Sequence, residues 1–185
     1  NPAHSRAAAR PLQSADAYTR SINAWRAQRE AGLRADDGWL TLVGLHWLRE
    51  GPNSVGGRPT ADVPLPEGSA PAAVGTIELA GGVARFRPDP AGGVRINGAP
   101  ARPQPLRPQP GDYDVVTTGS VTFFVIKRGD RYGVRVRDAE SPGRRHFAGL
   151  HWYPVREHYR VTATFVPHSR AQISRTADAP RHFAS

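Results

Sequence analysis

Four arginines on one predicted β-hairpin form the clearest chemical pattern in the sequence. Two alternating segments, Val121–Arg128 and Arg131–Asp138, are separated only by Gly129-Asp130, a pair typical of a two-residue hairpin loop. That loop length fixes the register, so that Arg128 pairs with Arg131 and the hairpin has one core face and one cationic face. The core face carries Val121, Phe123, Val125, Tyr132, Val134 and Val136, and the cationic face carries Arg128, Arg131, Arg135 and Arg137, with Phe124, Ile126 and Gly133 among them.

The chemistry expected of the cationic face is anion binding, because a guanidinium group holds a carboxylate or phosphate through two parallel hydrogen bonds. On and around this face we predict ligand contacts from Arg131, Arg135, Arg137, Arg144, Arg145 and Trp152. Two alternatives stay open. The arginine stems could cover Phe124 and Ile126 on a solvated sheet face. The net charge of +9 could also be compositional, since only Lys127 of the 25 basic residues is a lysine.

Three histidines and nearby carboxylates give a second, enzymatic hypothesis. His146, His151 and His158 follow Asp138 closely, and imidazole with carboxylate can hold zinc or act in hydrolysis. Their spacing matches no compact metal motif, and Ser141 lacks the strand-turn-helix context of a nucleophilic serine. We favour a structural role for Asp138, as an acceptor for the turn that begins at Ser141. A hydrolase using His146, His151, His158 and Asp138 is the alternative hypothesis, and no metal or cofactor is expected.

The aromatic residues argue against nucleic-acid binding, although the basic charge would allow it. They do not alternate with basic residues as in a single-strand stacking platform, and no recognition helix is evident. Trp25, Trp39 and Trp47 lie inside apolar patterns and are expected in the core. Trp152-Tyr153 precedes a proline in a predicted loop, so we expect partial exposure there.

One helix and a β domain are expected to position these side chains. Residues 1–13 show no periodicity and are expected to form a flexible arm. A helix is predicted over 14–35, with Ser14 as its cap and with Tyr18, Ile22 and Trp25 on the face that packs on the domain.

Residues 36–175 alternate short strand-like segments with glycine and proline turns, which is typical of an antiparallel β domain. The segment 39–48 is apolar on both faces and should be buried. Alternation over 159–165 predicts a half-buried strand, and residues 176–185 are expected to be disordered. The predicted fold class is mainly β, an antiparallel β-sandwich or open barrel with one N-terminal amphipathic helix.

Two glycine pairs, Gly81-Gly82 and Gly92-Gly93, are expected to be hairpin turns. Neither is followed by the Lys-Ser/Thr or the helical pattern of a phosphate-binding loop.

Composition limits the classes of protein further. With 185 residues, 38% apolar, 19 Gly and 18 Pro, a long coiled coil or helical bundle is excluded. No run approaches the roughly 18 apolar residues of a membrane-spanning helix, and the lack of Cys excludes disulfides and thiolate chemistry.

The chain starts at Asn1 and contains no Met, so removal of a signal peptide or trimming is expected. We predict a periplasmic or secreted location, with the cytoplasm as the alternative.

Three blocks of residues fit one known family. They are Gly38-Trp39-Leu40-Thr41-Leu42-x-Gly44-Leu45-x-Trp47-Leu48 with Gly51-x-Asn53, then Arg128-Gly129-x-Arg131 with Val134-Arg135-Val136-x-Asp138, then Phe147-x-Gly149-Leu150-x-Trp152-Tyr153-Pro154. In this order they resemble the bacterial family called domain of unknown function 1684, over about residues 16–170. Members of that family usually continue further, so the resemblance implies that this chain corresponds to their N-terminal and central part. It implies a layout and transfers no catalytic residue.

We therefore expect a binding or accessory module for an acidic small molecule or a polyanion. The alternative is a hydrolase whose site is completed by residues missing from this chain.

Overall fold

A computed structural model describes residues 14–164 of the chain. The fold is mainly β with one N-terminal helix, as the sequence predicts. The chain divides into two units, Arg20–Trp152 and a smaller unit whose described residues are 14–19 and 153–164. The predictions for residues 1–13 and for 165–185 lie outside the described residues.

Helix α1 spans Ala15–Arg34 and confirms the predicted helix. The Ser14 hydroxyl accepts a hydrogen bond from the Ala17 N–H at 3.3 Å, which caps the helix start. Asp16 in the first turn and Arg34 in the last complement the helix dipole. The helix is mostly polar, and within it only Leu33 is buried. The prediction that Trp25 lies in the core is wrong, because 54% of its surface is exposed.

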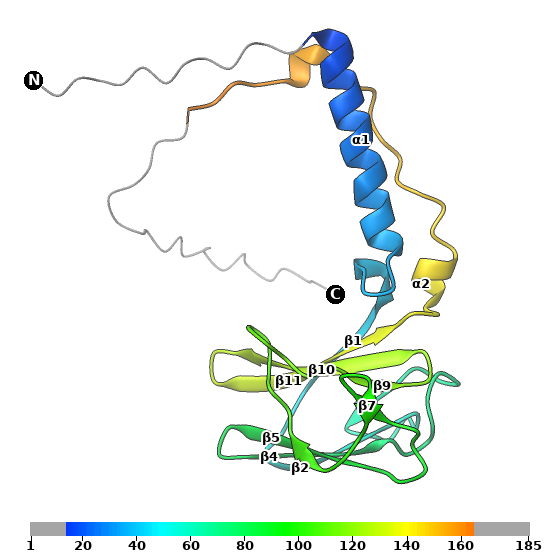
Figure 1. The fold of residues 1–185 in the computed structure, drawn as a ribbon, viewed down its shortest axis with the longest axis vertical. Coiled ribbons are helices and arrows are strands. Elements are labelled where there is room, and N and C mark those ends of the chain that lie inside the picture. The colour runs from blue at the N-terminus through cyan, green and yellow to red at the C-terminus, as the bar shows by residue number, and fades with distance from the viewer. Residues whose placement is uncertain (1–13, 165–185) are drawn as a thin grey trace, which may run out of the picture. The chain divides into compact units, whose positions relative to one another are not determined.

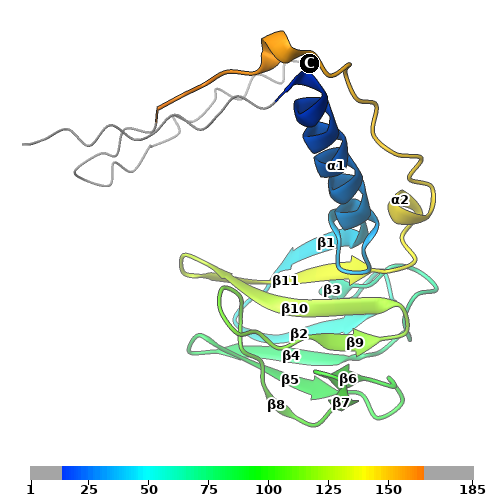
Figure 2. The ribbon, with the colours of Figure 1, turned by 45° about the horizontal axis from the view of Figure 1, so that its top comes forward.

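Eleven strands form two sheets in the larger unit (Figures 1 and 2). One sheet has the strand order β1-β11-β10-β9-β6-β7, and the other has the order β3-β2-β4-β5-β8. The strands are β1 (Leu42–Trp47), β2 (Gly51–Gly56), β3 (Val63–Pro64), β4 (Gly75–Ala80), β5 (Val83–Pro88), β6 (Arg95–Ile96), β7 (Ala99–Pro100), β8 (Gln104–Pro105), β9 (Val116–Thr118), β10 (Val121–Arg128) and β11 (Arg131–Asp138). Two short helices belong to the same unit, η1 (Trp39–Thr41) and α2 (Pro142–Arg145), and η2 (Glu157–Tyr159) belongs to the smaller unit. Among these strands every pair is antiparallel except β2 with β3.

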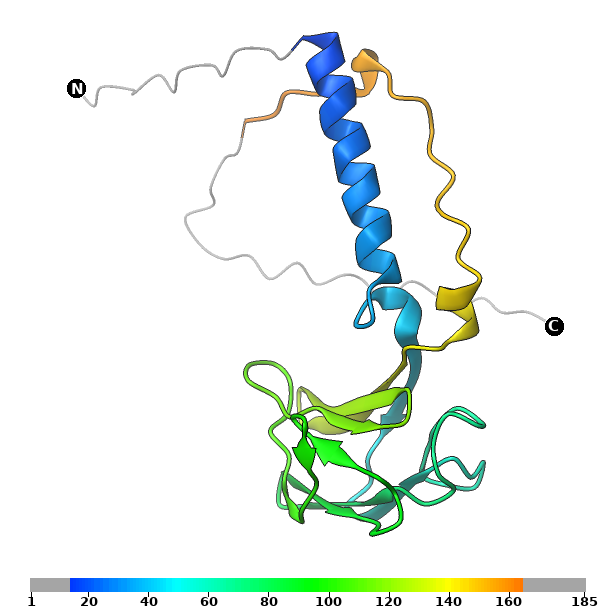
Figure 3. The same ribbon diagram turned by 45° about the vertical axis from the view of Figure 1, so that its right-hand side comes forward.

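The two sheets face each other and enclose one hydrophobic core, so the fold is a β-sandwich (Figure 3). Phe86 of β5 and Phe123 of β10 meet edge to face across the sheets, with ring centroids 5.7 Å apart. Both rings are fully buried. The rest of this core consists mainly of Val, Leu and Ile from alternate positions of the strands, which is the pattern that a sandwich requires.

The Gly81-Gly82 pair closes the β4–β5 hairpin, as expected. Both residues have positive φ, +56° and +77°, which glycine adopts without strain. The expectation for Gly92-Gly93 is wrong, because that turn connects β5 to β6, which lie in different sheets.

The prediction that the segment 39–48 is buried is also wrong. Trp39 is 69% exposed, Leu45 44% and Trp47 38%. Strand β1 lies at the edge of its sheet and pairs only with β11. Leu45 and Trp47 lie opposite Arg135 and Gly133, on the face of the sheet turned away from the core. Apolar composition shows that a segment can form a strand, and it does not show whether that strand lies at an edge.

In the smaller unit, the predicted strand over 159–165 is wrong for its described part. Tyr159 ends η2, and no strand forms between residues 153 and 164. Tyr159 and Val161 are largely exposed. Alternation alone cannot make a strand where no neighbouring strand supplies hydrogen-bond partners.

Within residues 14–164, no helix combines the length and apolar character needed to cross a membrane.

Candidate functional site

The β10–β11 hairpin has the predicted register, with Arg128 opposite Arg131 across the Gly129-Asp130 loop. Gly129 takes φ +58°, which such a tight loop needs. Phe124 lies opposite Arg135, and Thr122 lies opposite Arg137. The four arginines therefore share the face turned away from the core. We call Arg128, Arg131, Arg135 and Arg137 the cationic face.

Two of these arginines stack on aromatic rings. The Arg131 guanidinium lies 4.0 Å from the ring centre of Trp47. That ring in turn lies against Gly133, where an added Cβ would come within 3.0 Å of it. The Arg137 guanidinium lies 5.2 Å from the Phe124 ring. Such cation–π contacts fix the guanidinium groups above the sheet without neutralising them.

The alternative that arginine stems cover apolar residues accounts for part of this face. Phe124 and Ile126 are only 1% exposed. Phe124 is covered by Arg137 and also by Tyr113, whose ring centre lies 4.8 Å away. Arg128 and Arg131 remain exposed at the hairpin end.

The cationic face has no internal counter-charge. Within residues 14–164, none of its four arginines has a carboxylate within 4.0 Å, whereas Arg34, Arg49, Arg87, Arg107, Arg144 and Arg145 all do. The Arg137 Nε is buried and has no hydrogen-bond partner in that part of the chain. Side chains two residues apart on a strand emerge about 7 Å apart. At that distance two charges in water repel by about 0.6 kcal/mol, a cost that the fold tolerates. An anion placed between two such arginines would be attracted by both.

The flanking arginines differ from the cationic face. The Arg144 guanidinium binds three groups of the protein itself. Its Nε donates to the Arg34 carbonyl and its Nη1 to the Ala139 carbonyl, each at 2.7 Å, and its Nη2 pairs with Asp36. It therefore joins the end of α1 to α2. Arg145 is exposed, with its Nε 3.9 Å from a Glu140 oxygen.

Trp152 is half-buried against α1 in the larger unit. Its indole N–H donates to Glu30 Oε1 at 2.8 Å, and its ring packs edge to face on Trp25 at 5.4 Å. The Leu150 N–H donates to the same carboxylate oxygen at 3.2 Å. These two donors, together with Arg34, lower the pKa of Glu30. The block 147–152 thus binds along the helix through a glutamate that the sequence pattern does not single out.

The residues of the enzymatic hypothesis are not gathered into a metal site in residues 14–164, where no group of three His, Asp or Glu side chains is placed to hold an ion. Asp138 is buried and accepts hydrogen bonds from Ser69 Oγ at 3.0 Å and Ser120 Oγ at 2.7 Å. His146 and His151 are exposed in the larger unit. In the smaller unit His158 is exposed and lies against the Tyr159 ring at 4.2 Å.

Ser141 does not act with them. Its hydroxyl donates to the Leu40 carbonyl at 2.6 Å and caps α2.

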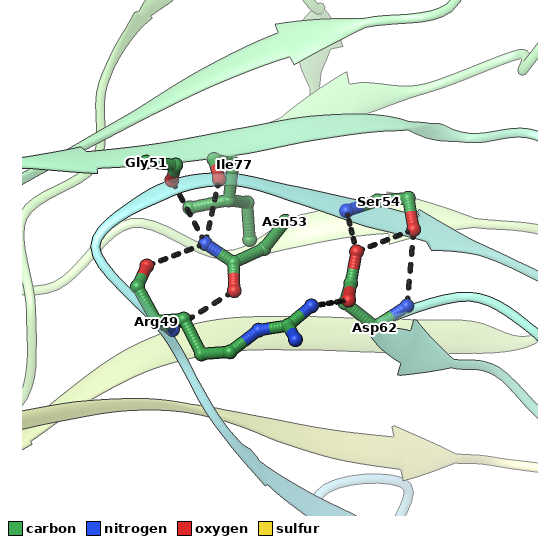
Figure 4. Close-up of polar contacts among 6 residues, drawn as sticks. All are labelled: Arg49, Gly51, Asn53, Ser54, Asp62 and Ile77. Carbon is green, nitrogen blue, oxygen red and sulfur yellow. Dashed lines mark hydrogen bonds and ion pairs between the residues drawn. The ribbon is translucent and has the colours of Figure 1, made fainter.

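A polar network that sequence reasoning missed holds the chain as it passes from β1 to β2 (Figure 4). Asn53 is 1% exposed, and its Oδ1 accepts the Arg49 N–H at 2.9 Å. Its Nδ2 donates to the carbonyls of Arg49, Gly51 and Ile77 at 2.8, 3.0 and 3.2 Å.

Beside Asn53, the Asp62 carboxylate binds the backbone N–H and the hydroxyl of Ser54, each at 2.8 Å, and pairs with Arg49. These contacts lower the pKa of Asp62. The contacts of Asn53 and Asp62 all run to neighbouring parts of the protein, so we assign the network a structural role.

An apolar pocket of about 340 Å³ opens beside β1 on the side facing the other sheet. Gly44 and His46 of β1 and the segment Pro64–Pro66 line it, with Asp138 at its margin. Burial lowers the pKa of His46, so that its imidazole is neutral at pH 7. A single histidine on an edge strand gives no sequence signal, and only the fold shows that it lines a pocket.

Comparisons with known proteins give a limited result. No protein-family model matches the sequence, and no curated protein is similar to it. Among solved structures, the FhaA FHA domain complexed with the intracellular domain of Rv3910 aligns with 50% of this chain and 97% of its own length, at 24% identity and a TM-score of 0.36. The FHA-2 domain of the Mycobacterium tuberculosis ABC transporter Rv1747 aligns with 48% and 77%, at 24% identity and a TM-score of 0.35. TM-scores this low transfer no ligand or binding residue to this chain.

Proposed function

We propose that the protein is a binding module whose cationic face takes an acidic or polyanionic ligand. The observation that carries this proposal is the lack of any carboxylate partner for Arg128, Arg131, Arg135 and Arg137 in residues 14–164. Two of them are fixed on aromatic rings, so part of the entropy lost on binding a ligand is lost already on folding. Guanidinium groups held in this way suit planar or tetrahedral anions.

The test is binding of a sulfated oligosaccharide and of a linear polyphosphate, measured by fluorescence anisotropy at several salt concentrations. Binding should weaken steeply with salt, because exposed charges are screened over about 10 Å at 0.1 M. The triple variant Arg131→Gln, Arg135→Gln and Arg137→Gln should lose most of the binding while it stays folded. If the wild-type protein binds only the sulfated oligosaccharide, or only the polyphosphate, that probe identifies the preferred anion.

A matched control separates a specific face from general charge. Arg58→Gln, Arg85→Gln and Arg102→Gln together change three exposed arginines outside the cationic face. Both triple variants lower the net charge from +9 to +6. If the two variants lose binding equally, the attraction comes from overall charge and the proposal is wrong.

A further inference from the structure

We propose that the open edge of β1 accepts an extended acidic peptide segment as an additional antiparallel strand. This inference rests on the anion-binding function proposed above and names its partner. It combines three features of one edge: main-chain groups that point outward, the cationic face on one side of the sheet, and the apolar pocket on the other.

The main chain of β1 has a free side. Strand β1 pairs only with β11, and within residues 14–164 no other strand is hydrogen-bonded to it; Figure 2 shows β1 next to β11. The Leu48 N–H donates to the Tyr132 carbonyl at 2.9 Å, which sets the phase of the ladder. Because successive residues of a strand turn their main-chain groups to opposite sides, those of Leu45 and Trp47 point to the open edge. A bulge between Leu42 and Gly44 ends the regular stretch, so four residues are available for pairing.

Its side chains lack the features that usually protect an edge. Strand β1 reads Leu-Val-Gly-Leu-His-Trp, without Lys or Pro. Leu45 and Trp47 are 44% and 38% exposed. Natural sheets usually protect such edges with charges, prolines, bulges or a covering segment. The bulge of β1 lies at its start, and the four residues after it carry no charge or proline, which is typical of a strand that pairs with something.

The side chains that the added strand presents on the same side as the cationic face must carry negative charge. The Arg131 guanidinium reaches over Trp47, so it lies above β1 and not only above its own strand. Arg135 lies directly opposite Leu45. A strand added beyond β1 would run about 4.8 Å from it. Its outward carboxylates or phosphates would then lie beside Arg131, which has no counter-charge of its own in residues 14–164.

The alternate side chains of the added strand, which point to the other side of the sheet, should be apolar. Side chains of the added strand that point away from the cationic face enter the pocket of about 340 Å³. Gly44 has no side chain, and the His46 imidazole occupies the space beside it, with its Nε2 2.6 Å from where a Cβ of Gly44 would lie. Pro64 and Leu65 line the pocket from the other sheet's side, so His46, Pro64 and Leu65 are the side chains that an entering apolar residue would meet. Peptides that add to a sheet edge gain affinity from main-chain hydrogen bonds and specificity from such alternate pockets.

A second copy of the chain fits this edge less well. Two β1 strands paired about a two-fold axis would form one continuous sheet, and both cationic faces would lie on the same surface. Like charges brought together in this way oppose the association. An acidic peptide removes that repulsion.

The probe is an acetylated octapeptide of alternating Glu and Val, labelled for fluorescence anisotropy, with a Lys/Val octapeptide as its charge control. In an antiparallel strand the residues opposite Leu45 and Trp47 share their outer face and turn their N–H groups to β1. N-methylation of the Glu residues should therefore weaken binding about tenfold, the loss expected for one or two hydrogen bonds. N-methylation of the Val residues, whose N–H groups point away from β1, should leave binding unchanged. If the two methylated peptides bind equally, strand addition is refuted.

A protein variant provides the second measurement. Leu45→Pro removes an N–H that points to the open edge, where proline is tolerated, and Leu45→Val is its control. The proline variant should keep its circular dichroism and its binding of the sulfated oligosaccharide but lose the Glu/Val peptide. If Leu45→Pro fails to fold, the methylated peptides still decide.

The remaining outcomes separate this inference from the proposed function. Binding of the oligosaccharide with equal binding of both methylated peptides would leave the anion-binding function standing and refute strand addition. Absence of binding to every anionic probe would overturn both. A dimer in sedimentation that Leu45→Pro dissociates, together with no peptide binding, would assign the edge to a second copy and refute the peptide.

Discussion

Replacing Asn53 tests how the buried amide supports the sandwich. Its Oδ1 accepts one hydrogen bond, and its two N–H groups are shared among three main-chain carbonyls, which amounts to about three bonds. At about 1 kcal/mol net for each bond, with some regained by water at the exposed Arg49, Asn53→Ala should lower the free energy of unfolding by about 3 kcal/mol. For a chain of this size that corresponds to a fall in melting temperature of about 6–12 °C. Urea unfolding followed by circular dichroism measures it.

The sharper variant is Asn53→Asp, which keeps the shape of the side chain. A carboxylate still accepts from the Arg49 N–H but faces the carbonyl oxygens of Arg49, Gly51 and Ile77 with nothing to donate. At pH 7 we therefore expect a loss larger than that of Asn53→Ala, about 4 kcal/mol or more. Burial beside three carbonyls raises the folded-state pKa of such a group, so its stability should recover as pH falls and the acid can donate once.

The control is Ser54→Ala, the next residue of β2, whose hydroxyl bonds lie at the surface. Its cost should stay below about 1 kcal/mol. The reasoning is refuted if Asn53→Asp is as stable as Asn53→Ala at pH 7, because the donor role of the amide would then contribute nothing.

Two further predictions concern other parts of the fold. Asp114, which accepts hydrogen bonds from Arg107 and Asn97, has its pKa lowered to about 2. A lowered folded-state pKa stabilises the fold above the unfolded value near 3.8, and this contribution is lost as pH falls through about 2. Urea unfolding from pH 6 to pH 2 should show wild type losing up to about 2 kcal/mol that Asp114→Asn does not lose; parallel curves would contradict it. Trp25→Ala should cost about 1 kcal/mol in a thermal melt, the value of one aromatic pair, because the ring is 54% exposed; a loss of 3 kcal/mol or more would show that this exposed position supports the whole unit.

The hairpin 121–138 and the helix 15–34 were predictable because their signals are local. A two-residue loop sets the register of the strands beside it, and the spacing of Tyr18, Ile22 and Trp25 marks a helix. The same spacing does not say what the helix meets, and Trp25 proved to be exposed.

What the sequence could not show is how distant segments meet. Trp47 has the composition of a core residue, yet its strand ends a sheet, and only the strand order reveals this. Glu30 reads as one surface charge of a polar helix, because its partners Leu150 and Trp152 lie about 120 residues away. In the sequence Asn53 cannot be told from an ordinary turn asparagine, because its partner Ile77 lies 24 residues away. The family resemblance over about residues 16–170 stays a prediction.

The contact between Glu30 and the block 147–152 has a consequence for the order in which the protein is made. On the ribosome, helix α1 emerges before the sheets, but the residues that bind the Glu30 carboxylate emerge only after β11, which ends at Asp138. A polar helix of 20 residues without a tertiary partner is only marginally stable in water. During synthesis the sandwich is therefore complete in sequence before Glu30 has its partners, and α1 lacks these two hydrogen bonds until Trp152 leaves the exit tunnel.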